Sequence, residues 1–169
     1  MIWSKLQKNV ESLMANSVKA HLQVHFTRYG SSGTLSMNRA WVTWDGKEIT
    51  TFSTIRWLNA RTSLASQLSG DNEPRVHYEY FAQAGELLEQ RGIYPSERFL
   101  AALEKYASLS SEDALASSDV LIRAWSMFDK RLGKRRLRAM HLDQSAPEIE
   151  RLWYQLRCNA EKIATPAMP

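Results

Sequence analysis

Arg39-Ala-Trp-Val-Thr-Trp44 and Lys47-Glu-Ile-Thr-Thr-Phe52 flank an Asp45-Gly46 pair, which is a strong two-residue hairpin signal. Asp-Gly pairs adopt the positive φ of a tight turn, so the flanking segments are predicted to be neighbouring antiparallel strands. Upstream, residues 20–29 alternate apolar and polar side chains, which is the period of a half-buried strand. We therefore expect a three-stranded antiparallel sheet, with Gly30-Ser-Ser-Gly33 as the turn or loop after its first strand.

Helical spacing of apolar residues dominates the rest of the chain. Residues 2–15 predict an amphipathic helix that is available to cover the apolar face of the sheet. After the sheet, further helices are predicted from apolar stripes: Ile55, Leu58, Ala65 and Leu68; Val76, Tyr80, Ala84 and Leu87; Phe99, Leu103 and Tyr106; Leu121, Trp125, Phe128 and Leu132; and Ile149, Leu152, Trp153, Leu156 and Ile163. The helix with Val76 and Tyr80 is expected to start at Pro74, and the last helix at a capping box, Ser145-Ala-Pro-Glu148. Ser110–Ser118 is expected to be a polar loop or a short turn.

The pattern as a whole predicts an α+β fold: an N-terminal helix, a three-stranded antiparallel sheet and a C-terminal bundle of four or five helices. We expect a single domain over residues 1–169, with the helix and β-meander in 1–53, the helical part in 54–164 and a frayed tail in 165–169. Hydrophobic residues make up 44% of the 169 residues and charged residues 24%, which is typical of a globular protein and not of a disordered one.

Several classes of protein are disfavoured by what the sequence lacks. No apolar run approaches the roughly 20 residues of a membrane helix, and the segment Met1–Lys8 lacks the apolar region of a secretion signal, so we expect a cytoplasmic protein without a membrane partner. The single Cys158 cannot form an internal disulfide and is predicted to be a buried thiol on a helix. We predict no catalytic residue, metal site or cofactor: the nucleotide-binding and nucleophile motifs are missing, and His21 and His25 lack a nearby acid or thiol.

The densest chemical signal is the segment Asp129-Lys-Arg-Leu-Gly-Lys-Arg-Arg-Leu-Arg138, hereafter the basic segment, with six cations and one acid. A helix running through it would place Arg131, Lys134, Arg135 and Arg138 on one face, where the like charges repel and an anionic partner would relieve the repulsion. Gly133 is the expected end of the preceding helix. The helix dipole stabilises cations at such a C-terminal end, which is a further reason for their presence here. Three interpretations stay open: a segment that is solvated or paired with acids of residues 71–119 within the molecule, one that binds a protein partner, or one that binds nucleic acid.

Other candidate partner-binding residues are an aromatic side chain and an acidic helix face. Trp41 and Trp44 have opposite strand parity, and Trp44, beside the turn, is the one expected to be more exposed. Exposed Trp and Arg are frequent anchors of protein interfaces. The candidate anchors are therefore Trp44, Arg131, Lys134, Arg135, Arg136 and Arg138, with Glu79, Glu86 and Glu89 as the alternative, acidic face. Trp3, Trp57, Trp125 and Trp153 are expected in the core.

Two segments resemble a family of uncharacterised small bacterial proteins. They are Trp3-Ser-Lys-Leu6 followed by Arg39–Ile49, and Ile122–Leu137, which contains an Asp-x-Arg-Leu-Gly-Lys-Arg box. The resemblance spans most of the chain and brings no activity with it. In its general form the chain also resembles immunity proteins, the small cytosolic inhibitors of antibacterial toxins.

The leading hypothesis is a cytoplasmic protein-binding module and not an enzyme. Its narrower form is an immunity-type inhibitor that binds one protein partner, a cognate toxin, in a one-to-one complex. The alternative is a nucleic-acid-associated protein that places the 130–138 cations on phosphates.

Overall fold

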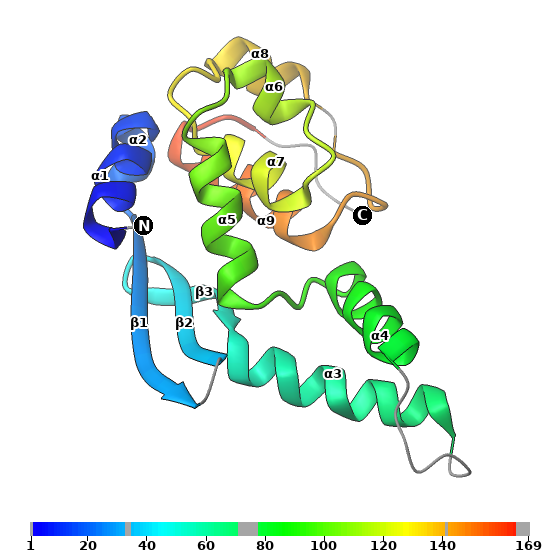
Figure 1. The fold of residues 1–169 in the computed structure, drawn as a ribbon. Coiled ribbons are helices and arrows are strands. Elements are labelled where there is room, and N and C mark those ends of the chain that lie inside the picture. The colour runs from blue at the N-terminus through cyan, green and yellow to red at the C-terminus, as the bar shows by residue number, and fades with distance from the viewer. Residues whose placement is uncertain (1, 33–34, 71–77, 141, 165–169) are drawn as a thin grey trace. The chain divides into compact units, whose positions relative to one another are not determined.

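The computed structural model describes residues 2–32, 35–70, 78–140 and 142–164, and its fold is the predicted α+β arrangement (Figure 1). In chain order the elements are α1 (Trp3–Leu13), α2 (Asn16–Lys19), β1 (Leu22–Ser32), β2 (Leu35–Trp44), β3 (Lys47–Ser53), α3 (Thr54–Ser69), α4 (Tyr78–Gln90), α5 (Ser96–Tyr106), α6 (Ser111–Leu115), α7 (Val120–Ser126), α8 (Lys134–Ala139) and α9 (Glu148–Ala160). The predicted helix start at Pro74, the side chain of Val76, the turn residue Gly33 and the tail 165–169 lie outside the described residues.

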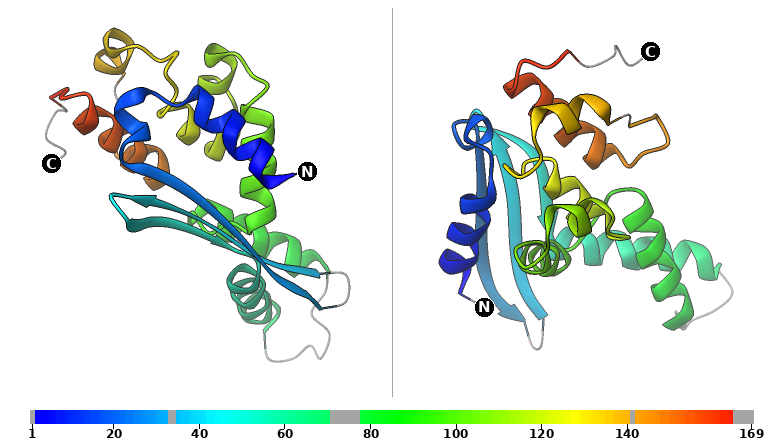
Figure 2. Two further views of the ribbon diagram at one scale, coloured as in Figure 1. Left: turned by 90° about the vertical axis from the view of Figure 1, so that its left-hand side faces the viewer. Right: turned by 90° about the horizontal axis from the view of Figure 1, so that it is seen from above.

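The three strands form one antiparallel sheet in the order β1-β2-β3 (Figure 2). The predicted hairpin is confirmed: Asp45 and Gly46 have φ of 50° and 76°, the positive values that a tight turn between β2 and β3 requires. The prediction of a turn at Gly30–Ser32 is wrong, because β1 continues through these residues. Gly30 has φ of 67°, so the strand absorbs the glycine as a local distortion while its pairing with β2 goes on.

The described residues group into two compact units. Unit 1 takes Met1–Val24, Val42–Thr50 and Leu100–Pro169, and unit 2 takes His25–Trp41 and Thr51–Phe99. The core of unit 1 is aromatic: the Trp153 ring lies 5.0 Å from that of Trp125 and 5.1 Å from that of Phe128, and all three side chains are buried. Such stacked and edge-on pairs add to the stabilisation that area burial gives. Two of the four predicted core tryptophans are therefore confirmed, while Trp3 is only half-buried.

Unit 2 is organised by the packing of α3 against α4, which lie side by side in Figure 1. The Arg61 guanidinium lies 4.8 Å from the ring centre of Trp57 and 5.1 Å from that of Phe81, and its Nε donates to the Phe81 carbonyl at 3.1 Å. Trp57, expected in the core, is therefore half-buried beneath an arginine. In the same unit, the ring of Phe52 on β3 stacks on that of Phe99, with 4.0 Å between the ring centres.

Two other local predictions are corrected by hydrogen bonds that sequence spacing does not reveal. Ser110–Ser118 is not simply a loop, because Ser110 Oγ accepts from the Asp113 amide and starts the short helix α6. Ser145 does not cap the last helix, because its hydroxyl and amide both donate to Asp143 at 2.5 and 2.8 Å. Helix α9 therefore starts after Pro147 without a side-chain cap.

Candidate partner-binding surface

The basic segment does not form one helix. Helix α7 ends at Ser126, residues 127–132 form turns, and α8 covers only Lys134–Ala139. Gly133 precedes α8 with φ −74° and ψ 160°, so it marks the start of a helix and not the predicted end of one. Arg131 consequently lies in a turn and does not share a helix face with Lys134, Arg135 and Arg138.

The helix ends early because other parts of unit 1 bind the backbone of the turn. The Ala15 amide donates to the Phe128 carbonyl at 2.9 Å, and the Lys130 amide donates to the Leu13 carbonyl at 2.8 Å. The buried Arg157 guanidinium also donates to the carbonyls of Phe128 and Leu132, at 3.2 and 3.3 Å. These bonds replace the intrahelical bonds that a continued α7 would form.

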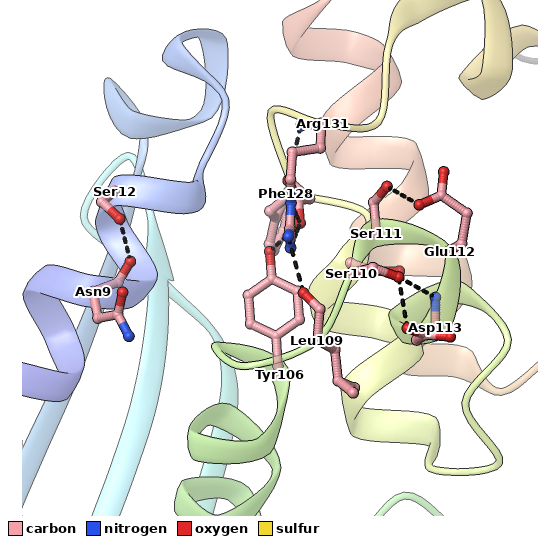
Figure 3. Close-up of polar contacts among 12 residues, drawn as sticks. Asn9, Ser12, Tyr106, Leu109, Ser110, Ser111, Glu112, Asp113, Phe128 and Arg131 are labelled. Carbon is pink, nitrogen blue, oxygen red and sulfur yellow. Dashed lines mark hydrogen bonds and ion pairs between the residues drawn. The ribbon is translucent and has the colours of Figure 1, made fainter.

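The single acid of the basic segment lies at the centre of this turn. Asp129 is fully buried, and Arg131 binds its carboxylate through Nε at 3.0 Å and Nη2 at 2.6 Å. The Tyr106 hydroxyl donates to the same carboxylate at 2.7 Å. Figure 3 shows Arg131 beside Tyr106 and reaching the Leu109 carbonyl, which its Nη1 contacts at 2.9 Å. Pairing with acids of residues 71–119 was one of the open interpretations. Arg136 does pair with an acid of that region, Glu112, whereas the acid that binds Arg131 lies two residues away.

The electrostatics of the turn follow from this geometry. Burial alone would raise the pKa of Asp129, but the hydrogen bonds from Arg131 and Tyr106 outweigh it and hold that pKa below its ordinary value. Burial, with the bond to Asp129, raises the pKa of Tyr106, and the bond to Asp129 raises the pKa of Arg131. The Asp129–Arg131 pair is therefore ionised at neutral pH and fixed in place.

Helix α8 is attached to unit 1 by apolar and polar contacts. Leu137 is fully buried, and the Tyr154 hydroxyl donates to the carbonyls of Leu137 and Met140 at 3.0 and 3.1 Å. Lys134 forms an ion pair with Glu161 of 3.0 Å, and Arg136 forms one with Glu112 of 2.8 Å. Glu161 is in turn bound by Ser17 and Arg157, at 2.6 and 3.1 Å. These contacts fix both the position and the rotation of α8.

Three of the six cations have no such partner. Within the described residues, Lys130, Arg135 and Arg138 are exposed and form no ion pair or side-chain hydrogen bond. Arg135 and Arg138 are one turn apart on α8 and are neighbours on the helix surface, while Arg135 is opposite the buried Leu137. We call Arg135 and Arg138 the α8 pair, and Arg131, Lys134 and Arg136 the held cations.

The remaining sequence candidates lie elsewhere. Trp44 belongs to unit 1 and is half-buried, since its ring stacks on His21 at 5.1 Å and on Phe128 at 6.1 Å. His21 is also bound to Asp45, at 2.6 Å, so Trp44 forms part of a packed corner of the hairpin. Glu79, Glu86 and Glu89 lie on α4 in unit 2, where Glu89 pairs with Arg98 at 3.7 Å. Glu79 and Glu86 are exposed and, in the part of the chain that the structure describes, form no ion pair.

The residues that sequence reasoning missed are those that hold the segment: Asp129, Tyr106, Glu161 and Tyr154. Only Asp129 carried a signal, as the one acid in a run of cations. The described residues contain no group of three or more His, Cys, Asp or Glu side chains that could hold a metal ion. Among the same residues, no helix combines the length and apolarity needed to cross a membrane. Cys158 is buried, as predicted, and burial raises its pKa.

Comparison with known proteins gives one match. Neither the search of curated proteins nor that of solved structures returned a match. A family model, described as that of the SF0329 protein family, matches residues 2–158, which include the sheet, the turn around Asp129 and α8. Because the match covers most of the chain, the chain belongs to the SF0329 protein family.

Proposed function

We propose that this protein is a protein-binding module and that the α8 pair contacts its partner. The observation that carries the proposal is the division of the basic segment: Arg131, Lys134 and Arg136 are held by Asp129, Glu161 and Glu112, whereas Arg135 and Arg138 are exposed and unpaired within the described residues. The held cations and Leu137 keep α8 in one orientation, so binding through Arg135 and Arg138 costs little ordering of the backbone. Arginine is enriched among the residues that dominate protein interfaces.

The same division weakens the case for nucleic acid. Affinity for a phosphate backbone grows with the number of phosphates that cations neutralise. The held cations already have carboxylate partners, so half of the cations of the segment are unavailable without breaking an ion pair. A protein interface, in contrast, is dominated by a few anchors and does not require an extended row of cations.

The narrower proposal is an immunity-type inhibitor that acts in the cytoplasm by forming a one-to-one complex with a cognate toxin. It is supported by the general resemblance to immunity proteins and by the presentation of two arginines on a fixed helix. Such an interface buries about 1,200–2,000 Å² in total and would extend well beyond α8.

The test is capture of the partner with tagged full-length protein from native extract, with and without nuclease, followed by mass spectrometry. A captured protein is then purified, and its complex with the chain is measured by light scattering and calorimetry. We expect a one-to-one complex that survives nuclease and that the double substitution Arg135→Glu with Arg138→Glu weakens at least 100-fold, because it places like charges in the interface.

The matched control is Lys8→Glu with Lys105→Glu, which makes the same change of net charge at two exposed lysines of unit 1, on α1 and α5. This control should keep the affinity within about threefold, since exposed charges outside the contact act mainly on the association rate. Retention that disappears with nuclease would move the function to nucleic acid. A complex that both double variants weaken equally would reject the α8 pair as the contact.

A further inference from the structure

We infer that the α8 pair recognises two neighbouring carboxylates on the surface of its protein partner. This inference rests on the proposed function and names the chemistry that the same surface accepts. Arg135 and Arg138 are three residues apart on one helix, so their side chains start about 5–6 Å from each other. Each guanidinium is planar and can form two parallel hydrogen bonds with one carboxylate, so two arginines that start side by side can bind two neighbouring carboxylates at once.

The spacing on α8 matches the arrangements in which proteins present acids. Two acids at i and i+4 of a helix are about 5–6 Å apart, and two acids facing each other on antiparallel strands are about 4.5–5.5 Å apart. A partner that exposes either of these can engage both arginines at once, without a change in α8.

The surroundings of α8 favour separate carboxylates over a phosphate chain. Glu112, which holds Arg136, keeps 65% of its side chain exposed, and Asp113 beside it is exposed as well. Asp143, four residues after α8, is also exposed. A nucleic acid carries its charges in a continuous row, one per about 1.7 Å of duplex axis, and would bring phosphates towards these acids. Two carboxylates on a folded partner need only reach Arg135 and Arg138.

The held cations show that this segment already binds carboxylates in two ways. Arg131 binds the Asp129 carboxylate through Nε and Nη2, at 3.0 and 2.6 Å. Arg136 binds the Glu112 carboxylate through Nη1 alone, at 2.8 Å. Both acids belong to the chain itself, and each also accepts a hydroxyl: Asp129 that of Tyr106 and Glu112 that of Ser111. The α8 pair, like the exposed Lys130 in the turn before it, has no carboxylate partner among the described residues of the chain.

The test uses ¹⁵N-labelled full-length protein and two alanine-based helical peptides of about 20 residues that each carry two glutamates. In one peptide the glutamates are at i and i+4, on one face; in the other they are at i and i+2, on different faces. A thymidine 12-mer and inorganic pyrophosphate are the phosphate probes. We expect the i, i+4 peptide to shift the amide signals of residues 134–139 and to bind about tenfold more weakly to the variant Arg135→Ala with Arg138→Ala. The i, i+2 peptide should bind several-fold more weakly than its isomer.

Lys8→Ala with Lys105→Ala is the control for loss of two positive charges and should bind the i, i+4 peptide as the wild type does. Equal binding of the two peptides would overturn the inference of a spaced carboxylate pair. Larger shifts at α8 with the 12-mer or pyrophosphate would assign the surface to phosphates. If the captured protein complex depends on the α8 pair while no peptide shifts α8, the proposed function stands and the carboxylate pair is rejected. A protein complex that does not depend on the α8 pair rejects that pair as the contact, and retention that disappears with nuclease rejects protein binding itself.

Discussion

The turn around Asp129 and the exposed side of α8 both belong to the ten residues of the basic segment, yet they have opposite roles. In the turn, Arg131 is bound to a buried carboxylate that also receives the Tyr106 hydroxyl. On α8, Arg135 and Arg138 are exposed and unpaired within the described residues. The difference teaches that the number of cations in a segment does not give the charge that its surface offers, because internal acids first neutralise a part of them.

The first prediction compares two arginines of this segment by their effect on stability. Replacing Arg131 by Ala removes the charged partner of the buried Asp129 carboxylate and leaves it with the bonds from the Tyr106 hydroxyl and the residue-131 amide, so it should lower the free energy of unfolding by about 3–5 kcal/mol. Replacing Arg135 by Ala removes an exposed side chain and should change it by less than about 0.5 kcal/mol. Urea unfolding followed by tryptophan fluorescence measures both. Equal losses for the two variants would remove the distinction between turn and surface.

The second prediction compares the hydrogen bonds of two tyrosines by their contribution to stability: one tyrosine donates to a charged acceptor and the other to neutral acceptors. Tyr106→Phe removes a bond to the ionised Asp129 and should cost about 1.5–3 kcal/mol, whereas Tyr154→Phe removes bonds to the carbonyls of Leu137 and Met140 and should cost about 0.5–1.5 kcal/mol. Both hydroxyls lie on buried side chains, so the comparison has little contribution from exposure. A larger loss for Tyr154→Phe would contradict the central place of Asp129. Tyr29→Phe, at an exposed tyrosine, is the control.

The third prediction concerns pH. The folded-state pKa of Asp129 is lowered, so the folded protein holds the ionised carboxylate more strongly than the unfolded chain does. Its contribution to stability is therefore complete above the unfolded pKa of about 4 and is lost as the pH falls through the lower, folded value. The difference in unfolding free energy between wild type and Asp129→Asn should stay constant from pH 7 to 5 and shrink below about pH 4. A difference independent of pH would show that the contribution of Asp129 is not ionic.

Much of the fold, and less of the surface, could be predicted from sequence. The hairpin was predictable because Asp45-Gly46 supplies its conformation locally, and the amphipathic helices because Leu6, Val10, Phe99 and Leu103 repeat at helical spacing and are buried. The end of α7 was not predictable, since it depends on bonds from Ala15 and Arg157, which are far away in the sequence. For the same reason the pairing of Lys134 with Glu161 could not be foreseen, whereas the exposure of Arg135 and Arg138 agrees with their polarity.

The last prediction is the smallest and tests whether the ion pair of Lys134 holds α8 or merely lies beside it. Lys134 is exposed at its end, so its pair with Glu161 should contribute only about 0.5–1 kcal/mol, and Lys134→Ala should lower the free energy of unfolding by no more than this. Arg138→Ala, one turn later on α8, should cause no measurable change, because it has no partner among the described residues. If Lys134 fixes the helix, amide exchange of residues 134–139 should become faster in Lys134→Ala and stay unchanged in Arg138→Ala. Identical exchange in the two variants would leave Leu137 and Tyr154 as the groups that hold α8 in place.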